Sequence, residues 1–222
     1  MKTTLLFALV SISLLFSIWY WMAHRYDEQA NLPPVHNGTA LAYFAGGCFW
    51  CTEADFEKLP GVTEVISGYS GGHTTDPTYE KVSSHTTGHL ETVEVRYDPT
   101  IVSYEKLVQY FFSHMDPTDP NGQFADQGGS YRSAIFFQSP EEKRVAEIEL
   151  ERLRDSQVYD QPLVTALLRF EKFYAAEEYH QNYWKKNPTR YTYYRNGSGR
   201  NQYLEKICQI RSEKNIPCTQ TR

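Results

Sequence analysis

The sequence predicts one mixed domain of helices and strands in two layers, preceded by an apolar N-terminal helix. Three observations support this prediction. With 222 residues, 41% of them hydrophobic and 15% aromatic, the chain can bury one sizeable core. Segments with strand and helix patterns alternate unevenly along the chain. The first two strand patterns are separated by a helix pattern, which is typical of an α/β or α+β two-layer domain.

The first residues form an apolar leader. Thr3 to Ala23 is almost uninterrupted apolar sequence, and at about 20 residues it is long enough to cross a bilayer as a helix. A secretory signal peptide has a shorter apolar region of roughly 7–15 residues and a small-residue cleavage site. Here the stretch ends in Trp19-Tyr20-Trp21, and aromatic residues suit a membrane interface. We therefore favour an uncleaved membrane anchor over residues 1–24, with a cleaved signal peptide as the alternative.

The leader also bears on location. Lys2 and Arg25 lie on opposite sides of it, so the charge asymmetry that sets membrane orientation is small. Its place at the very N-terminus favours export of the following domain, with the bacterial periplasm as the leading case. An exported domain lies in an oxidising compartment, and its thiols then need a dedicated reductant.

After the leader, we expect a linker over residues 25–38, which contain Pro33-Pro34. We expect the folded domain over residues 39–207 and a C-terminal tail over residues 208–222. Strands are predicted, in order, at Ala40 to Phe44, Val62 to Tyr69, His89 to Tyr97, Arg132 to Gln138 and Leu163 to Phe170.

Three helices are predicted between these strands. The first covers Thr52 to Leu59, directly after a cysteine motif. The second runs from Tyr104 to Met115, with Ser103 as its N-cap. The third begins after Ser139, which is followed by a proline at the first helical position and two glutamates.

The charge pattern excludes one class of function. A formal net charge of -5 argues against a nucleic-acid partner. Lys185 to Lys214 is locally basic, but its Lys and Arg residues are scattered among Tyr and Gly, so we expect a solvated face rather than a phosphate-binding surface. A monomer is expected.

The motif Gly46-Gly47-Cys48-Phe49-Trp50-Cys51 indicates a reactive thiol. Two glycines allow a tight turn and a close approach to Cys48. The helix predicted next places Cys48 in or just before its first turn. Unpaired N–H groups and the positive end of the helix dipole favour the thiolate there. Cys48 is therefore the candidate nucleophile.

Glu91 is the candidate acid. Strand alternation over His89 to Tyr97 places Glu91 on the more apolar face, together with Val93 and Val95. Desolvation there would raise the pKa of the carboxyl group and keep it protonated near neutral pH. The alternative is a glutamate at the end of a strand that turns out to solvent.

The cysteine motif, with the TEADFEKLPGV that follows it, resembles the A-type peptide methionine sulfoxide reductases, whose signature is GCFW. The resemblance covers roughly residues 40 to 205. It implies a two-layer ferredoxin-like plait with loop-rich extensions, a role in repair of oxidised proteins, and no metal or organic cofactor. Further blocks carry it in the same order: Ser67 to Gly72, Pro77 to Tyr79, Thr87 to Glu91, Gln127 to Ser133 and Glu178 to Gln181.

Reduction of a sulfoxide needs a nucleophile at sulfur, an acid for the oxygen, hydrogen-bond donors to that oxygen, and an apolar seat for the methyl group. Cys48 would attack the sulfur and end as a sulfenic acid. By its match to the family block, Glu91 would be the acid. His180 also matches a block, but it receives no catalytic role.

Five other residues match the family site. The resemblance implies that the hydroxyls of Tyr79 and Tyr131 hold the sulfoxide oxygen, and that Asp126 lines the site and helps position the substrate. Phe49 and Trp50 would form the apolar seat. The alternatives are simple packing for the tyrosines, core positions for Phe49 and Trp50, and a turn position for Asp126.

Cys51 departs from the commonest family pattern, which has glycine there and resolves the sulfenic acid with a distal C-terminal cysteine. Cys48 and Cys51 form a CxxC pair whose sulfurs can approach on one helical turn, so we expect Cys51 to resolve. Cys208 and Cys218 could relay oxidation or close a structural disulfide, which we favour. A disulfide that closes this loop of about 11 residues would add roughly 3 kcal/mol to the free energy of unfolding. A zinc site of all four cysteines is not expected.

The leading hypothesis is thiol-dependent reduction of methionine S-sulfoxide, free or in proteins, with recycling by a thioredoxin-like protein. Two alternatives belong to other classes. The bare CxxC also fits a thioredoxin-like disulfide oxidoreductase. A membrane-tethered domain that only binds oxidised methionine is the non-enzymatic alternative.

Overall fold

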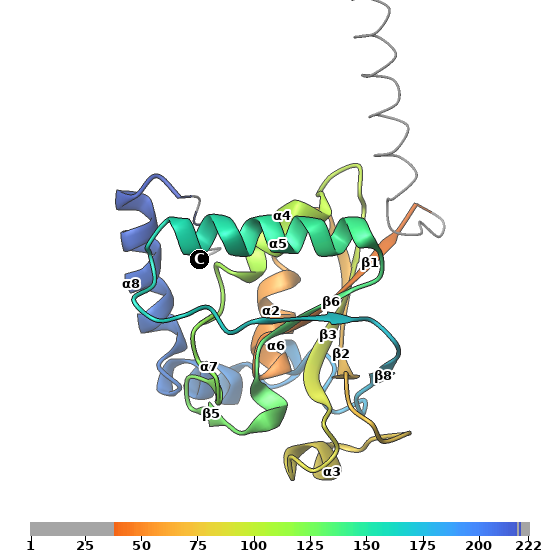
Figure 1. Ribbon diagram of the computed structural model, residues 1–222. Helices are drawn as coiled ribbons and strands as arrows, with labels where there is room; N and C mark the ends of the chain where they lie inside the picture. The colour runs from red at the N-terminus through yellow and green to blue at the C-terminus, as the bar shows by residue number, and fades with distance from the viewer. Residues whose placement is uncertain (1–37, 217, 219–222) are drawn as a thin grey trace, which may run out of the picture.

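Figure 1 shows the fold in a computed structural model that describes residues 38–216 and 218. The predicted leader, residues 1–24, lies outside the described residues, and so does the predicted linker up to residue 37. Within the two described ranges, no helix is both long and apolar enough to cross a bilayer.

The centre of the fold is a sheet built from β1 (Ala40–Ala45), β2 (Val62–Ser70), β3 (Leu90–Tyr97), β6 (Ala134–Phe137), β7 (Ala166–Arg169) and β8 (Phe173–Ala175). The strands lie in the order β7-β6-β1-β3-β2-β8. β6 and β7 pair in parallel, and the other neighbours pair antiparallel. A separate hairpin joins β4 (Gly122–Gln123) to β5 (Asp126–Gln127). Each of the five predicted strands overlaps an observed one, whereas β8 and the hairpin were not predicted.

The helices of the described residues are α2 (Phe49–Phe56), α3 (Tyr79–Ser83), α4 (Tyr104–Phe111), α5 (Pro140–Asp155), α6 (Tyr183–Lys186), α7 (Pro188–Gly197) and α8 (Arg200–Glu213), with a 3-10 turn, η1 (Gly129–Tyr131). Both predicted N-caps are present, because the Ser103 and Ser139 hydroxyls accept hydrogen bonds from N–H groups of the first turns. The mixed α+β class is confirmed.

One face of the sheet packs against α2, α4 and α5. Phe44 in β1 and Val95 in β3 lie on this face, in one buried cluster with side chains from all three helices. The ring centroid of Phe44 lies 5.1 Å from that of Phe111 in α4. On the opposite face, Tyr43 stacks on Phe170 at 3.9 Å. Because α2 follows β1 directly and packs on the same sheet, the turn between them is held in a fixed place.

That turn requires its glycines. Gly47 has φ +80°, in the left-handed region that favours glycine. A Cβ on Gly47 would lie 2.4 Å from the Cβ of Gln123 in the β4–β5 hairpin. The predicted tight turn is therefore present, and the hairpin packs directly against it.

The last helices correct one prediction. Lys185 to Lys214 does not form a uniformly solvated face, because Arg200 and Arg211 are only 1% and 0% exposed. Arg211 donates a hydrogen bond to the carbonyl of Phe112, the C-cap of α4, and Arg200 donates one to the carbonyl of His114 in the turn that follows, both at 2.9 Å. The last carbonyls of a helix lack partners within the helix, and arginine side chains can satisfy them.

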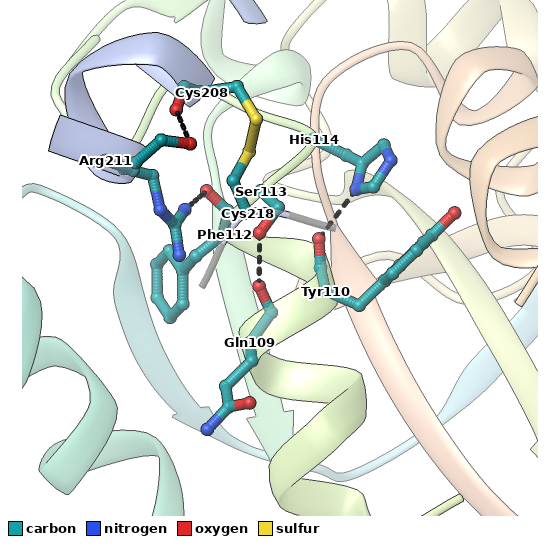
Figure 2. The surroundings of a disulfide bond; sticks show 9 residues. Gln109, Tyr110, Phe112, Ser113, His114, Cys208, Arg211 and Cys218 are labelled. Atoms are coloured by element: carbon teal, nitrogen blue, oxygen red, sulfur yellow. Dashed lines mark hydrogen bonds between the residues drawn. A yellow bond between two sulfur atoms is a disulfide. The ribbon is translucent and has the colours of Figure 1, made fainter. Parts of the chain in front are cut away.

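Figure 2 shows the disulfide between Cys208 in α8 and Cys218, beside Ser113 at the end of α4. The predicted bridge is thus present. The boundary predicted between residues 207 and 208 falls inside α8. Cys48 and Cys51 are free thiols.

Candidate active site

Cys48 is the N-cap residue of α2. Its carbonyl accepts the first hydrogen bonds of the helix, from the N–H groups of Cys51 at 3.1 Å and Thr52 at 3.2 Å. Its side chain makes no capping hydrogen bond. The thiol is therefore available for chemistry, in the position predicted for it just before the first turn.

The charge of the cysteine pair differs from the expectation. Burial raises the pKa of Cys48, and the hydrogen bond with Cys51 raises it further. The pKa of Cys51 falls to about 7, chiefly because of that hydrogen bond and then because of the charges of Arg200 and Arg195. Asp126 is among the acids that face Cys48. In the free protein the pair thus favours the thiolate on Cys51, because the hydrogen bond with Cys48 and then the charges of the two arginines stabilise it there.

Glu91 lies on the buried face of β3, where only 3% of it is exposed. The solvent-facing alternative is therefore wrong. Its carboxylate accepts a hydrogen bond from the backbone N–H of Phe49 at 2.9 Å, in the first turn of α2 and next to Cys48. Burial raises the pKa of Glu91 to about 8, although the Phe49 hydrogen bond lowers it. At neutral pH the carboxyl group is mostly protonated and can give up a proton.

Tyr79 and Tyr131 come from distant segments and meet at this site. Tyr79 opens α3, and its backbone N–H donates to Glu177 at 2.9 Å. Tyr131 ends η1 and hydrogen-bonds the Tyr79 hydroxyl. Burial raises the pKa of both tyrosines, and so do the charges of Glu91 and Cys48. Both hydroxyls remain protonated and can act as hydrogen-bond donors.

The two aromatics of the motif differ in their surroundings. Phe49 is 1% exposed and belongs to the main core cluster. It therefore occupies a core position, as the alternative interpretation expected. Trp50 is half-buried. Its ring stacks on Tyr183 at 3.8 Å, and its Nε1–H donates to Nδ1 of His180 at 3.0 Å. Trp50 thus presents a fixed, partly open apolar surface beside Cys48.

Asp126 begins β5 and lies at the same site. It accepts a hydrogen bond from the hydroxyl of Tyr194 in α7. The pKa of Asp126 is raised because burial outweighs the hydrogen bond from Tyr194 and the charge of Arg200, which both act to lower it. The charge of Asp126 in turn raises the pKa of Cys48 and Glu91. Asp126 is therefore more than a turn residue.

The sequence did not predict the contributions of α7 and α8. Arg195 forms a buried ion pair with Asp55 at 2.9 Å, and Tyr194 and Arg200 contact the site as described. These residues follow the last recognised sequence block, and neither helix shows an apolar stripe that would have marked it. A run of tyrosines and arginines after residue 190 was the one available signal.

Within the described residues, no group of three or more His, Cys, Asp or Glu side chains could hold a metal ion. Electrostatic interactions link the predicted site groups Cys48, Cys51, Glu91, Tyr79, Tyr131 and Asp126 to one another.

Known proteins resemble this chain over the same region. The family Peptide methionine sulfoxide reductase matches residues 40–212. The Bacillus velezensis protein Peptide methionine sulfoxide reductase MsrA is 52% identical over 165 residues, which cover 74% of this chain and 93% of that protein. Peptide methionine sulfoxide reductase MsrA/MsrB from Vibrio cholerae is 48% identical over 206 residues, 91% of this chain. The chain spans about half of that longer relative, 52% of its length.

Two solved structures share the fold. Methionine sulfoxide reductase A of Corynebacterium diphtheriae has a TM-score of 0.62 and 34% identity, covering 69% of this chain and 77% of its own. Reduced Mxr1 from Saccharomyces cerevisiae has a TM-score of 0.63 and 32% identity, covering 68% and 87%. The family match, the relatives and the site geometry agree: the chain belongs to the peptide methionine sulfoxide reductase family.

Proposed function

We propose that this chain reduces methionine S-sulfoxide, free or in proteins, by attack of Cys48 on the sulfoxide sulfur. The observation that carries the proposal is the pairing of Cys48 with Glu91. A buried carboxyl group of raised pKa is bonded to the N–H of Phe49, the residue after the nucleophile. Separate enzymes reduce the two sulfoxide epimers, so one such site serves one epimer.

In the first step, the Cys48 sulfur forms a bond to the sulfoxide sulfur while Glu91 protonates the sulfoxide oxygen. Tyr79 and Tyr131 donate hydrogen bonds to that oxygen, and Trp50 provides the apolar surface for the methyl group. The protonated oxygen then moves to Cys48: the transient S–S bond and the S–O bond of the sulfoxide break, an S–O bond to Cys48 forms a sulfenic acid, and methionine leaves. Methionine sulfur gains two electrons, and the thiol of Cys48 loses two. The proton that Cys48 gives up replaces the one that Glu91 has donated, so Cys51 remains a thiolate.

In the second step, the Cys51 thiolate attacks the sulfenic acid. A disulfide forms between Cys48 and Cys51, the S–O bond breaks, and hydroxide leaves as water once protonated. Two observations support Cys51 in this role. It hydrogen-bonds Cys48 in the reduced site, and the other two cysteines are already paired with each other.

A reductant must then open the Cys48–Cys51 disulfide. Thiol–disulfide exchange with an external dithiol performs this reaction and restores both thiols. A thioredoxin-like protein is the proposed partner, because its paired cysteines release it from the mixed disulfide. No organic cofactor is needed for either step.

Three further proposals concern organisation. The apolar leader would anchor the chain with its domain in the periplasm, and the Cys208–Cys218 bridge suits such an oxidising compartment. Protease digestion of spheroplasts tests this location: a protected domain would contradict it. The boundaries predicted at residues 24 and 38 also stay proposals. The ferredoxin-like plait is proposed for β6-β1-β3-β2, with α2 between β1 and β2 and α4 between β3 and β6 in support.

The function is tested with the S and R epimers of methionine sulfoxide supplied separately to the full-length chain, with dithiothreitol. The proposal expects methionine from the S epimer alone, and none from a folded Cys48→Ser variant. Failure of the folded wild type to reduce either epimer would contradict the proposal and favour a disulfide oxidoreductase.

A further inference from the structure

Arg200 is a buried cation behind the active-site turn. It is the first residue of α8 and is 1% exposed. Its Nη2 donates to the carbonyl of Gly46 at 3.0 Å, and its Nη1 donates to the carbonyl of His114 at 2.9 Å. Its guanidinium carbon lies 4.6 Å from the ring centroid of Phe124. The guanidinium thus joins α8 to the residue two before Cys48.

These partners do not neutralise the charge. Two carbonyls and an aromatic ring are uncharged, and among the described residues Arg200 forms no ion pair with Asp or Glu. Arg195, by contrast, is paired with Asp55 at 2.9 Å. A buried charge without a counter-ion is costly. An anion close to Arg200 would remove that cost.

The anionic groups near Arg200 belong to the active site. The hydrogen bond with Cys48 is the largest cause that lowers the pKa of Cys51, and the charge of Arg200 lowers it further. Burial raises the pKa of Asp126, and the charge of Arg200 opposes that rise. Arg195 also lowers the pKa of Cys51, but the charge of its partner Asp55 acts in the opposite direction. The charged and titratable groups that face Cys51 are Cys48 and Asp55 from α2, Glu91 from β3, Tyr191, Tyr194 and Arg195 from α7, and Arg200 from α8.

We propose that Arg200 is a positioning residue for the resolving step: its guanidinium holds the carbonyl of Gly46, two residues before Cys48, and its buried charge, which has no carboxylate partner among the described residues, stabilises the negative sulfur of Cys51. The inference rests on the proposed function and names a residue that the motifs do not include. The step itself is the attack of the Cys51 thiolate on the sulfenic acid of Cys48. The S–S bond forms, the S–O bond breaks, and the oxygen leaves as water after protonation.

The experiment is a single turnover of the full-length, reduced chain with one equivalent of methionine S-sulfoxide, from pH 5.5 to 9.5. Two products are followed separately. Methionine release reports the first step, and loss of sulfenic acid that dimedone can trap reports the second. Wild type is compared with Arg200→Met and Arg200→Lys. The control is Arg211→Met, since Arg211 is equally buried in α8 and also bonds a backbone carbonyl.

For Arg200→Met we expect an unchanged methionine yield and slower disulfide formation, by about fivefold at pH 7. Its pH midpoint should rise toward that of an ordinary thiol, because a rise of about one unit from about 7 lowers the thiolate fraction at pH 7 from about one half to about one tenth. Arg200→Lys should restore the midpoint at least in part. Arg211→Met should lower stability and leave the midpoint unchanged.

Three outcomes decide the matter. A midpoint in folded Arg200→Met equal to that of wild type overturns the inference. If Arg200→Met does not fold, the test uses Arg200→Lys, and its thiolate is titrated by absorbance at 240 nm. If Arg200→Lys has the thiolate titration of wild type but no longer forms the disulfide, the argument from charge is overturned. If wild type itself releases no methionine, the proposed function fails instead, so the two failures are distinguishable.

Discussion

The surroundings of the Glu91 carboxyl group are unfavourable for its charged form. Burial raises its folded-state pKa from 4.5 to about 8. Between these two pH values the folded protein binds more protons at Glu91 than the unfolded chain does. The free energy of unfolding must therefore fall as pH rises through this window. The burial that makes the group an acid thus destabilises the fold at alkaline pH.

Glu91→Gln should reverse both effects. We expect the first-turnover rate to fall by about 10²- to 10⁴-fold, because the acid is lost, and the variant to unfold less readily than wild type above pH 8, by an amount on the order of a few kcal/mol. Rapid quench measures the first-turnover rate, and urea unfolding at pH 5 and 8.5 measures the free energy of unfolding. Exposed Glu147→Gln is the control. An unchanged first-turnover rate would remove Glu91 from the acid role.

Gly47 tests the turn that presents Cys48. Gly47→Ala combines a left-handed φ of +80° with a clash against Gln123, so we expect roughly 1–3 kcal/mol of destabilisation and lower activity. Gly197→Ala is the matched control, since no atom lies within 4 Å of its added Cβ. Urea unfolding compares the two. Equal stability for both variants would show that the turn is not constrained.

At the scale of elements, the N-cap and the first turn of α2 carry both reacting sulfurs, so they should complete the oxidation of the two cysteines alone. Cys51→Ser should release one equivalent of methionine and then stall with Cys48 as a sulfenic acid. Methionine yield and the dimedone adduct measured by mass spectrometry check this. Steady turnover of the variant with thioredoxin and thioredoxin reductase would assign the resolving role to Cys208 or Cys218.

Helix α8 is the second element with a testable part. Replacing both Cys208 and Cys218 by serine removes the bridge from α8 to the tail. We expect a loss of roughly 3 kcal/mol in the free energy of unfolding and unchanged steady-state reduction, because the site is held by Arg200 at the other end of α8. Urea unfolding and the steady-state assay measure both. Lost turnover in a folded variant would restore the relay alternative.

At the scale of the whole molecule, the sequence predicted what short-range pattern controls. The alternation around Val93 and Val95 placed Glu91 on the buried face, and the glycine pair placed Cys48 at the start of a helix. The five strands followed from the same periodicities. Family blocks predicted Tyr79, Tyr131 and Asp126 at the site, and all three interact electrostatically with Glu91.

Long-range contacts could not be predicted in this way. Arg200 and Arg211 are buried because the end of α4 and the turn that follows it offer them carbonyls, and no local pattern near residue 200 encodes α4. The pKa of Cys51 depends on the same contacts. The helix terminus alone assigned the thiolate to Cys48, and only the folded chain shows the charge of Arg200 beside Cys51.

The central claim is that Cys48 takes the sulfoxide oxygen and Cys51 resolves it. Peptide mapping of the full-length chain, reduced at its free thiols and treated with one equivalent of methionine S-sulfoxide, tests this claim directly. The account predicts a new disulfide between Cys48 and Cys51, with Cys208–Cys218 intact. A disulfide from Cys48 to Cys208 or Cys218, or a Cys48 that stays unmodified while methionine is released, would contradict it.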